Sequence, residues 1–399
     1  MVPSQAARDD LGAQVTLAEL DADPYPVYRR LRDAEPVAWV PAVGLWFVTR
    51  WDDATAVASD PQRFTAAVGA SPLERTLGRN VLTVDGDPHR RMRASLGPAL
   101  RSAAVHRSAP GVVGPIVERL FAGLAGRGEA ELMAELFEPV SVLSLATVLG
   151  IGEIDADPLR RWFSGLAAGG ANFEGDPDKQ ALADDTSREI DETLAPIVAR
   201  LEREPDDSIL SHMLHADVPD GAPTRAETLS NLKLILLGGM QEPGHGAGNC
   251  MYGALSHPDV RARLAGDPAL TDQAIEEGLR WLSPVGTSTR EVVEAVEVAG
   301  VELPAGAHVA AVHASANRDE RHWTDPDRLD LDRSEGGHRS FGFGAHFCAG
   351  NLLARYEMRI PFRTLFERCP GLRLDPDQPV EVSGWEFRGV KQLPVRWDA

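Results

Sequence analysis

The chain has 399 residues, of which 43% are hydrophobic and 25% charged, as is typical of a soluble globular protein with a large core. A formal net charge of −20 argues against nucleic acid as a partner, because binding to phosphates depends on Lys and Arg. No apolar run approaches the roughly 20 residues that span a bilayer, and the N-terminus lacks the apolar core of a signal peptide. The three cysteines form no disulfide framework. We therefore expect a cytoplasmic protein without membrane or nucleic-acid partners.

Hydrophobic periodicity and the positions of proline and glycine predict helices and strands along most of the chain. The segments expected to be helical are 23–32, 52–59, 88–96, 112–124, 138–149, 158–168, 177–202, 207–214, 224–256, 258–264, 271–282 and 351–367. The segments expected to contain strands are 36–40, 43–49, 291–303, 308–313 and 380–397. Asp52 or Asp53 should cap the helix at 52–59. No linker rich in Gly, Ser or Pro and no internal repeat divides the chain, and we expect residues 1–22 to be held loosely.

A basic cluster lies at residues 89–93 of this acidic chain. Pro88 precedes a predicted helix in which His89 and Arg93 are four residues apart and therefore project from one face. On its own this pair is best interpreted as a solvated helix face.

The segment 224–256 combines two conflicting signals. Residues 228–237 are apolar nearly all round, as expected of a helix through the centre of a protein. The next ten residues, 238–247, read GGMQEPGHGA and place four glycines and a proline inside the same helix, which lowers its helix propensity strongly. We expect a distorted backbone there, or one that other contacts hold in place.

The most informative stretch is FGFGAHFCAG at residues 341–350. Gly342 and Gly344 allow positive φ angles and a close approach to a large ligand. Cys348 lies at the start of a predicted helix, where free N–H groups and the helix dipole favour a thiolate over a thiol. A thiolate on such a loop is suited to be the axial ligand of a haem iron. The simpler interpretation is a buried structural cysteine beside a turn.

The pattern Phe-Gly-x-Gly-x-His-x-Cys-x-Gly closely resembles the haem-binding loop of the cytochrome P450 family, the haem-thiolate monooxygenases. Glu277-x-x-Arg280 is a weak motif alone, because a solvated pair on a helix contributes little, but it matches the Glu-x-x-Arg pair of that family. The resemblance implies the cytochrome P450 fold, mainly α with a small β-rich lobe, as a single domain over residues 1–399. It also implies haem b as the cofactor and Cys348 as the ligand of its iron.

The resemblance further implies roles for other residues. The haem propionates would be bound by His89, Arg93, Arg290 and His346; the alternative role of His346 is to stabilise its own loop. The loop that holds the haem would include Phe341, Gly342 and Gly350. The pair Glu277 and Arg280 would be buried and would hold the segment before that loop. Candidates for the substrate pocket are Phe173, Met240, Val285, Gly286, Thr287, Ser288 and Phe387.

The largest departure from the family pattern lies at residues 238–243. The family segment Ala/Gly-Gly-x-Asp/Glu-Thr relays protons to bound dioxygen, and here Gln241 and Glu242 occupy the positions of the acid and the alcohol. Desolvation near a haem would raise the pKa of Glu242, so that it can donate a proton, with Gln241 orienting a water. Two outcomes stay open: oxygen insertion through this substitute relay, or hydrogen abstraction followed by radical coupling or desaturation.

The function that the resemblance implies is oxidation of a small, aromatic, natural-product-like molecule. The Gly-Gly-x-x-Glu-Pro pattern is similar to that of bacterial enzymes that demethylate methoxylated aromatics or couple aromatic diketopiperazines, so hydroxylation, O-dealkylation and radical coupling are all included. A ferredoxin or similar electron-transfer protein is the expected partner. Arg90 and Arg91 are candidates for its docking surface, because complementary charge steers such encounters. The alternative is a haem-binding sensor or carrier without turnover.

Overall fold

The computed structural model describes residues 10–69, 71–172, 175–218 and 221–398. Its α-helices are α1 (Leu11–Gln14), α2 (Leu17–Ala22), α3 (Tyr25–Ala34), α4 (Trp51–Ser59), α5 (Pro72–Leu77), α6 (Gly86–Leu100), α7 (Ser102–Ala122), α8 (Glu138–Leu149), α9 (Ala156–Gly170), α10 (Pro177–Arg203), α11 (Ile209–Leu214), α12 (Arg225–Met240), α13 (Glu242–Ser256), α14 (Pro258–Gly266), α15 (Thr271–Trp281), α16 (His313–Ala316) and α17 (Asn351–Arg368). A π-helix, η1, spans Met133–Phe137, and the 3-10 helices are η2 (Pro268–Leu270) and η3 (Gly344–His346).

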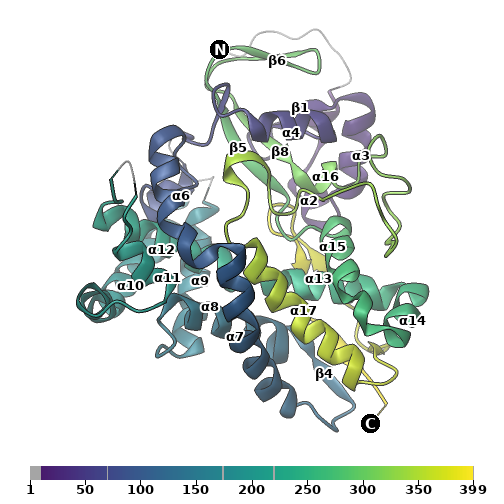
Figure 1. Ribbon diagram of the computed structural model, residues 1–399. Helices are drawn as coiled ribbons and strands as arrows, with labels where there is room; N and C mark the ends of the chain where they lie inside the picture. The colour runs from purple at the N-terminus through teal and green to yellow at the C-terminus, as the bar shows by residue number, and fades with distance from the viewer. Residues whose placement is uncertain (1–9, 70, 173–174, 219–220, 399) are drawn as a thin grey trace.

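The strands are short and fall into four sheets. They are β1 (Val37–Val40), β2 (Leu45–Val48), β3 (Phe64–Thr65), β4 (Glu129–Glu131), β5 (Thr287–Val292), β6 (Val296–Val298), β7 (Val301–Leu303), β8 (His308–Val312), β9 (Arg373–Leu374), β10 (Val382–Ser383), β11 (Gly389–Val390) and β12 (Pro394–Arg396). The main sheet has the order β1-β2-β8-β5-β3, and the expected hairpin forms its edge, with Val37 opposite Val48. In Figure 1 this sheet lies at the top with α2, α3, α4 and α16, and most of the other helices fill the lower part.

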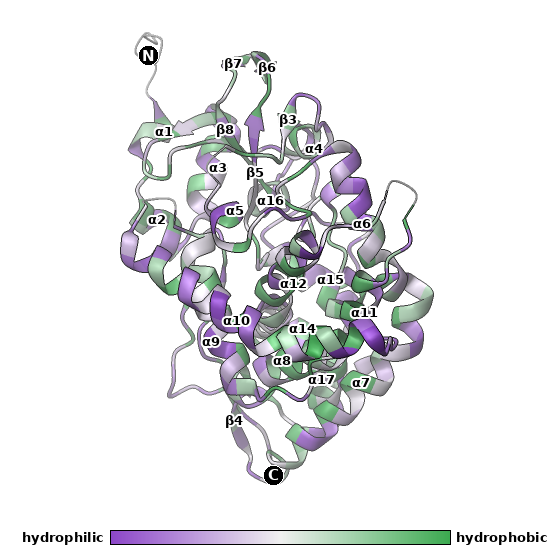
Figure 2. Ribbon diagram, turned by 90° about the vertical axis from the view of Figure 1, so that its left-hand side faces the viewer, coloured by the Kyte–Doolittle hydropathy of each residue, from purple (hydrophilic) through white to green (hydrophobic). Residues whose placement is uncertain are grey.

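Helix α13 runs through the helical part and contacts α8, α15, α17 and η1. Glycines allow this close packing: a methyl group on Gly246 would come within 2.7 Å of the sulfur of Met358, and one on Gly248 within 2.4 Å of the sulfur of Met133. Figure 2 shows α8 and α12 largely green, as expected of central helices, whereas α10 carries much more purple. The glycines of α13, which were expected to weaken that helix, therefore let the neighbouring helices approach it closely.

The long helix expected at 224–256 is interrupted at Gln241, where α12 ends and α13 begins. Pro243 has no N–H, so the carbonyl of Gly239, four residues earlier, lacks its usual helical donor. The hydroxyl of Ser141 in α8 donates to that carbonyl oxygen at 3.3 Å. The expectation of a distortion held by other contacts is thus confirmed.

Two local expectations were wrong. The segment Leu11–Ala22, expected to be loose, forms α1 and α2; Leu20 is fully buried, and Thr16 and Glu19 form a capping box. Residues 1–9 lie outside the described residues. Neither Asp52 nor Asp53 caps α4; instead the N–H of Trp51 donates to the buried carboxylate of Asp319 at 2.9 Å.

Among the described residues, no helix is both long and apolar enough to cross a membrane.

Candidate active site

The loop before α17 holds Cys348 through backbone geometry. Gly342 and Gly344 adopt the positive φ angles of +72° and +71° that glycine tolerates. The N–H of Cys348 donates to the carbonyl oxygen of Phe341 at 2.9 Å and closes the loop. A side chain at Gly344 would come within 2.9 Å of the carbonyl oxygen of Ala58, so this position also needs glycine for space. The half-buried Cys348 is therefore fixed just before the first turn of α17.

The electrostatic environment of Cys348 contains opposing effects. Burial raises the pKa of its thiol, whereas hydrogen bonds from the N–H groups of Gly350 and Asn351 and the nearby charges of Arg93 and Arg355 lower it; the net direction is upward. The expected preference of the helix N-terminus for a thiolate is thus present but weaker than the effect of burial. A metal cation bound at the sulfur would supply the missing positive charge, because a coordinating thiol is deprotonated.

Residues far apart in the sequence form a cluster of donors beside this loop. The rings of His89 and His346 lie 4.3 Å apart, centre to centre, and Nε2 of His346 bonds Oδ1 of Asp85 at 2.8 Å. Burial alone would raise the pKa of Asp85, but hydrogen bonds from His346, Thr65 and Ala66 lower it to about 2. Burial and the charges of His346 and Arg93 lower the pKa of His89 to about 4, so His89 is neutral.

Two ring nitrogens of this cluster lack a hydrogen-bond partner, and its two arginines lack an acidic partner, among the described residues. Nε2 of His89 and Nδ1 of His346 are buried without a hydrogen-bond partner. Arg93 donates to the carbonyl oxygen of Phe347 at 2.6 Å, and the buried Arg290 to its neighbour Thr289 at 2.8 Å. No ion pair of either guanidinium is found within the part of the chain that the structure describes. Because buried donors are normally satisfied, these residues fit a ligand with carboxylate groups, as the two propionates of a haem provide.

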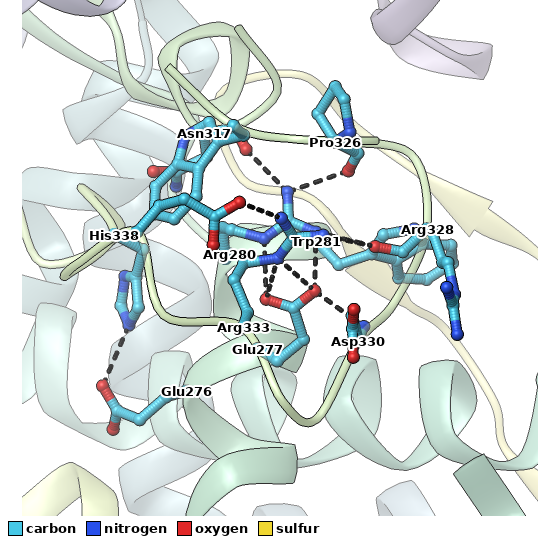
Figure 3. A network of polar contacts seen from close by, with 12 residues as sticks. Glu276, Glu277, Arg280, Trp281, Asn317, Pro326, Arg328, Asp330, Arg333 and His338 are labelled. Carbon is cyan, nitrogen blue, oxygen red and sulfur yellow. Dashed lines mark hydrogen bonds and ion pairs between the residues drawn. The ribbon is translucent and has the colours of Figure 1, made fainter. Parts of the chain in front are cut away.

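The segment between α16 and the Cys348 loop is held by a buried ion network (Figure 3). Arg280 binds both carboxylate oxygens of Glu277, at 2.7 and 2.8 Å, and Arg333 approaches the same carboxylate at 2.9 and 3.1 Å. Arg280 also donates to the carbonyl oxygens of Asn317 and Pro326, both at 2.8 Å. The Glu-x-x-Arg pair is therefore buried and fastens residues 317–333, as expected.

The interruption between α12 and α13 carries three polar side chains. Nε2 of Gln241 lies 2.8 Å from Nε2 of His245. Burial lowers the pKa of His245 to about 4, so its ring is neutral and carries its proton on Nδ1 when the Gln241 amide donates. Oε2 of Glu242 is fully buried without a partner. Burial, and then the charge of Glu386, raise the pKa of Glu242 to about 8.

Comparison with known proteins identifies the family. A family model described as cytochrome P450 matches residues 266–384. The chain is 34% identical to the cytochrome P450 monooxygenase PikC of Streptomyces venezuelae, over 97% of this chain and 94% of that protein. This chain is a cytochrome P450. It is also 30% identical to 6-deoxyerythronolide B hydroxylase of Saccharopolyspora erythraea, over 96% and 99% of the two chains.

Solved structures agree with this assignment. P450BioI in complex with an acyl carrier protein that carries hexadec-9Z-enoic acid matches with a TM-score of 0.87 and 25% identity, over 96% of this chain and 100% of that one. The expected fold, mainly helical with small sheets, is confirmed. The protein is a P450 monooxygenase with haem as its cofactor. The alternative of a sensor or carrier without turnover is therefore not retained.

The residues that were expected to line the substrate pocket lie in different surroundings in the structure. Met240 is 1% exposed within an apolar core cluster, so it packs against other helices instead of facing a cavity. Gly286 is explained by packing, because a methyl group there would lie 2.0 Å from the carbonyl oxygen of Trp385. Val285 forms a β-bridge with Phe387, which is 48% exposed. Phe173 lies outside the described residues.

Two other pocket candidates make polar contacts that the sequence did not suggest. The hydroxyl of Thr287 donates to Oε2 of Glu386 at 2.6 Å. Ser288 bonds Nε2 of His313 at 2.7 Å, and burial together with Arg290 lowers the pKa of that histidine to about 3. Glu386 and His313 were not among the expected site residues.

The two arginines expected to dock a redox partner differ. Arg90 is exposed and pairs with Asp87 of its own helix. Arg91 instead binds the largely buried carboxylate of Glu227 in α12 at 2.9 Å, so it links α6 to α12. Arg91 is therefore a structural residue, and only Arg90 stays available on that face.

Proposed function

We propose that this P450 oxidises a small apolar or aromatic, natural-product-like molecule and that Cys348 binds the haem iron. The observation that carries the proposal is the position of Cys348, held at the start of α17 beside a cluster of buried donors without acceptors. Haem, when bound, supplies the iron that activates dioxygen, and an axial thiolate donates electron density to it. The setting we propose is the cytoplasm, which suits three cysteines that are all free.

His89, Arg93, Arg290 and His346 are the residues we propose for the propionates. His89 and His346 present unpartnered nitrogens, and the two arginines supply positive charge. Phe341, Gly342 and Gly350 shape the loop that holds the haem on the side of the thiol. Arg93 and Arg290 also stay charged in this buried cluster, where two carboxylates would compensate them.

Glu242 is the residue we propose to deliver protons. Its pKa of about 8 keeps the carboxyl protonated at neutral pH, and a protonated carboxyl can donate a hydrogen bond. Gln241, which bonds His245, is positioned to hold a water beside it. An acid at this position would deliver the protons that reduction of dioxygen consumes, whether the outcome is oxygen insertion or radical coupling.

The proposed reaction and the proposed substrate class rest on two different observations. The names of the two relatives, a monooxygenase and a hydroxylase, support hydroxylation. The aromatic character, and the alternatives of O-dealkylation or diketopiperazine dimerisation, rest on the Gly-Gly-x-x-Glu-Pro pattern at residues 238–243. A ferredoxin or similar protein is proposed to deliver electrons near the Cys348 loop, where Arg339 and Arg355 line a cavity of about 400 Å³.

The assignment of Cys348 is tested by its replacement. In Cys348→Ala, the red-shifted Soret band of the reduced carbon monoxide complex should disappear, because that band requires a thiolate ligand. Cys369→Ala is the matched control, since it removes another buried thiol and should keep the band. Survival of the band in Cys348→Ala would show that the ligand assignment is wrong.

A further inference from the structure

The turn at residues 385–389 brings a glutamate to the segment expected to face the substrate. The N–H of Gly286 donates to the carbonyl oxygen of Glu386 at 2.8 Å, and Asn249 of α13 donates to that of Arg388 at 2.9 Å. The ring of His245 lies against Gly389, where a methyl group would come within 3.3 Å of it. The turn is therefore fixed both to residues 284–288 and to α13.

Glu386 and Glu242 are two carboxyl groups that form no ion pair with any described residue. Oε2 of Glu386 accepts from the hydroxyl of Thr287 at 2.6 Å, whereas Oε2 of Glu242 is buried without a partner. The two groups are close enough for the charge of Glu386 to raise the pKa of Glu242. Burial also raises the pKa of Glu386, and no basic side chain among the described residues acts on either carboxyl.

The surroundings decide which carboxyl carries a charge. Two neighbouring, partly buried carboxyls do not both ionise readily, so the pair holds at most one negative charge. That charge belongs on Glu386, because the Thr287 hydroxyl stabilises its ionised form and Oε2 of Glu242 has no donor. A charge partly removed from water is stabilised by an opposite charge, and none of the described residues supplies one to Glu386.

We propose that the substrate of this P450 carries a cationic amine, and that Glu386 binds it. This inference rests on the proposed function, because it names the substrate class of the same site. The amine supplies the missing counter-charge, Thr287 orients the Glu386 carboxylate, and Glu242 keeps its proton. The net charge of −20 also favours the approach of a cation over that of an anion.

A pair of probes that differ only in charge tests this assignment. The phenethyltrimethylammonium ion cannot ligate iron through its quaternary nitrogen, and (3,3-dimethylbutyl)benzene is its neutral carbon isostere. Binding of both to the haem-loaded protein is measured by equilibrium dialysis. The native protein should bind the cation about ten-fold more tightly or better, and Glu386→Gln should abolish that preference. Glu242→Gln should keep it, because an amide there replaces a neutral carboxyl.

Glu381→Gln is the matched control, since it removes an exposed carboxylate that pairs with Lys391 in the same C-terminal region, and it should keep the preference. Equal affinity for the two probes in the native protein, including no binding of either, would contradict the proposal, as would a preference that persists in Glu386→Gln. These outcomes are distinct from failure of the proposed function. That failure would appear as absence of the red-shifted Soret band from the reduced carbon monoxide complex of the native protein. A retained haem spectrum in Glu386→Gln shows that the variant is folded.

Discussion

The carboxyl group of Glu242 gives the clearest pH dependence at the scale of a single residue. Its raised pKa of about 8 means that it is protonated below pH 8 and loses its proton as the pH rises through 8. If it delivers protons, the share of reducing equivalents released as hydrogen peroxide should rise between about pH 7 and pH 9. The measurement compares electron-donor consumption, product and peroxide at each pH.

Glu242→Gln cannot supply that proton at any pH. It should therefore release more peroxide than the native protein at pH 7 and show no further rise up to pH 9. A pH profile shared by Glu242→Gln and the native protein would exclude Glu242 as the donor.

Single residues also show where the sequence was insufficient. The spacing of His89 and Arg93 predicted a shared helix face, and the glycine pattern located Cys348, because both signals are local. The partner of His346, Asp85, lies 261 residues away and became apparent only in the folded chain. Position offered one hint, since Asp85 is the residue directly before α6 and lies four residues before His89. The contact between Thr287 and Glu386 had no such signal.

At the scale of an element, the junction of α12 and α13 depends on a side chain from another helix. Pro243→Ala restores an N–H that can donate to the Gly239 carbonyl, so the hydroxyl of Ser141 is then no longer needed there. Ser141→Ala should lower the free energy of unfolding by about 1 kcal/mol in the native sequence and by clearly less in the Pro243→Ala background. Chemical denaturation of the four proteins of this double-mutant cycle measures the difference.

Equal losses in both backgrounds would mean that the Ser141 bond does not replace the helical one. The same data test a second possibility. If Pro243→Ala alone is strongly destabilising, the bend between α12 and α13 is held by packing and not caused by the missing N–H donor.

Elements were predicted best where proline or glycine marks their ends. Helix α8 has the expected limits, and α10 extends one residue beyond them. Helix α7 begins at Ser102, well before the expected start at 112, because Pro110 and Gly111 look like helix breakers while Val105 and Ala109 are buried on its inner face. Tertiary packing therefore outweighed local propensity.

At the scale of the whole molecule, the network around Glu277 joins α15 to the chain that leads to the haem loop. Glu277→Gln leaves the buried guanidiniums of Arg280 and Arg333 without their carboxylate, and should cost about 3–5 kcal/mol of unfolding free energy. The loss should appear as a lower melting temperature and poorer haem incorporation. Asp332→Asn is the control, since its pair with Arg263 is exposed and should contribute less than about 1 kcal/mol. Equal effects of the two substitutions would contradict a central role for the buried network.

The architecture as a whole followed from the family resemblance of the Cys348 loop and of the Glu277-x-x-Arg280 pair. What the motifs did not specify is how the strands assemble. Strand β8, for example, pairs in parallel with β2 from the other end of the chain, and no local pattern fixes that partner.

The carboxylate of Asp85 joins two regions that otherwise have separate tasks. One of its oxygens holds Thr65 and Ala66, both at 2.7 Å, at the start of a segment that precedes α5, while the other oxygen holds His346. A displacement of residues 65–66 therefore pulls on the imidazole of His346, unless one of these short bonds breaks. Substitutions that shift residues 65–66 would therefore reach His346, which we propose to bind a haem propionate, through this one carboxylate.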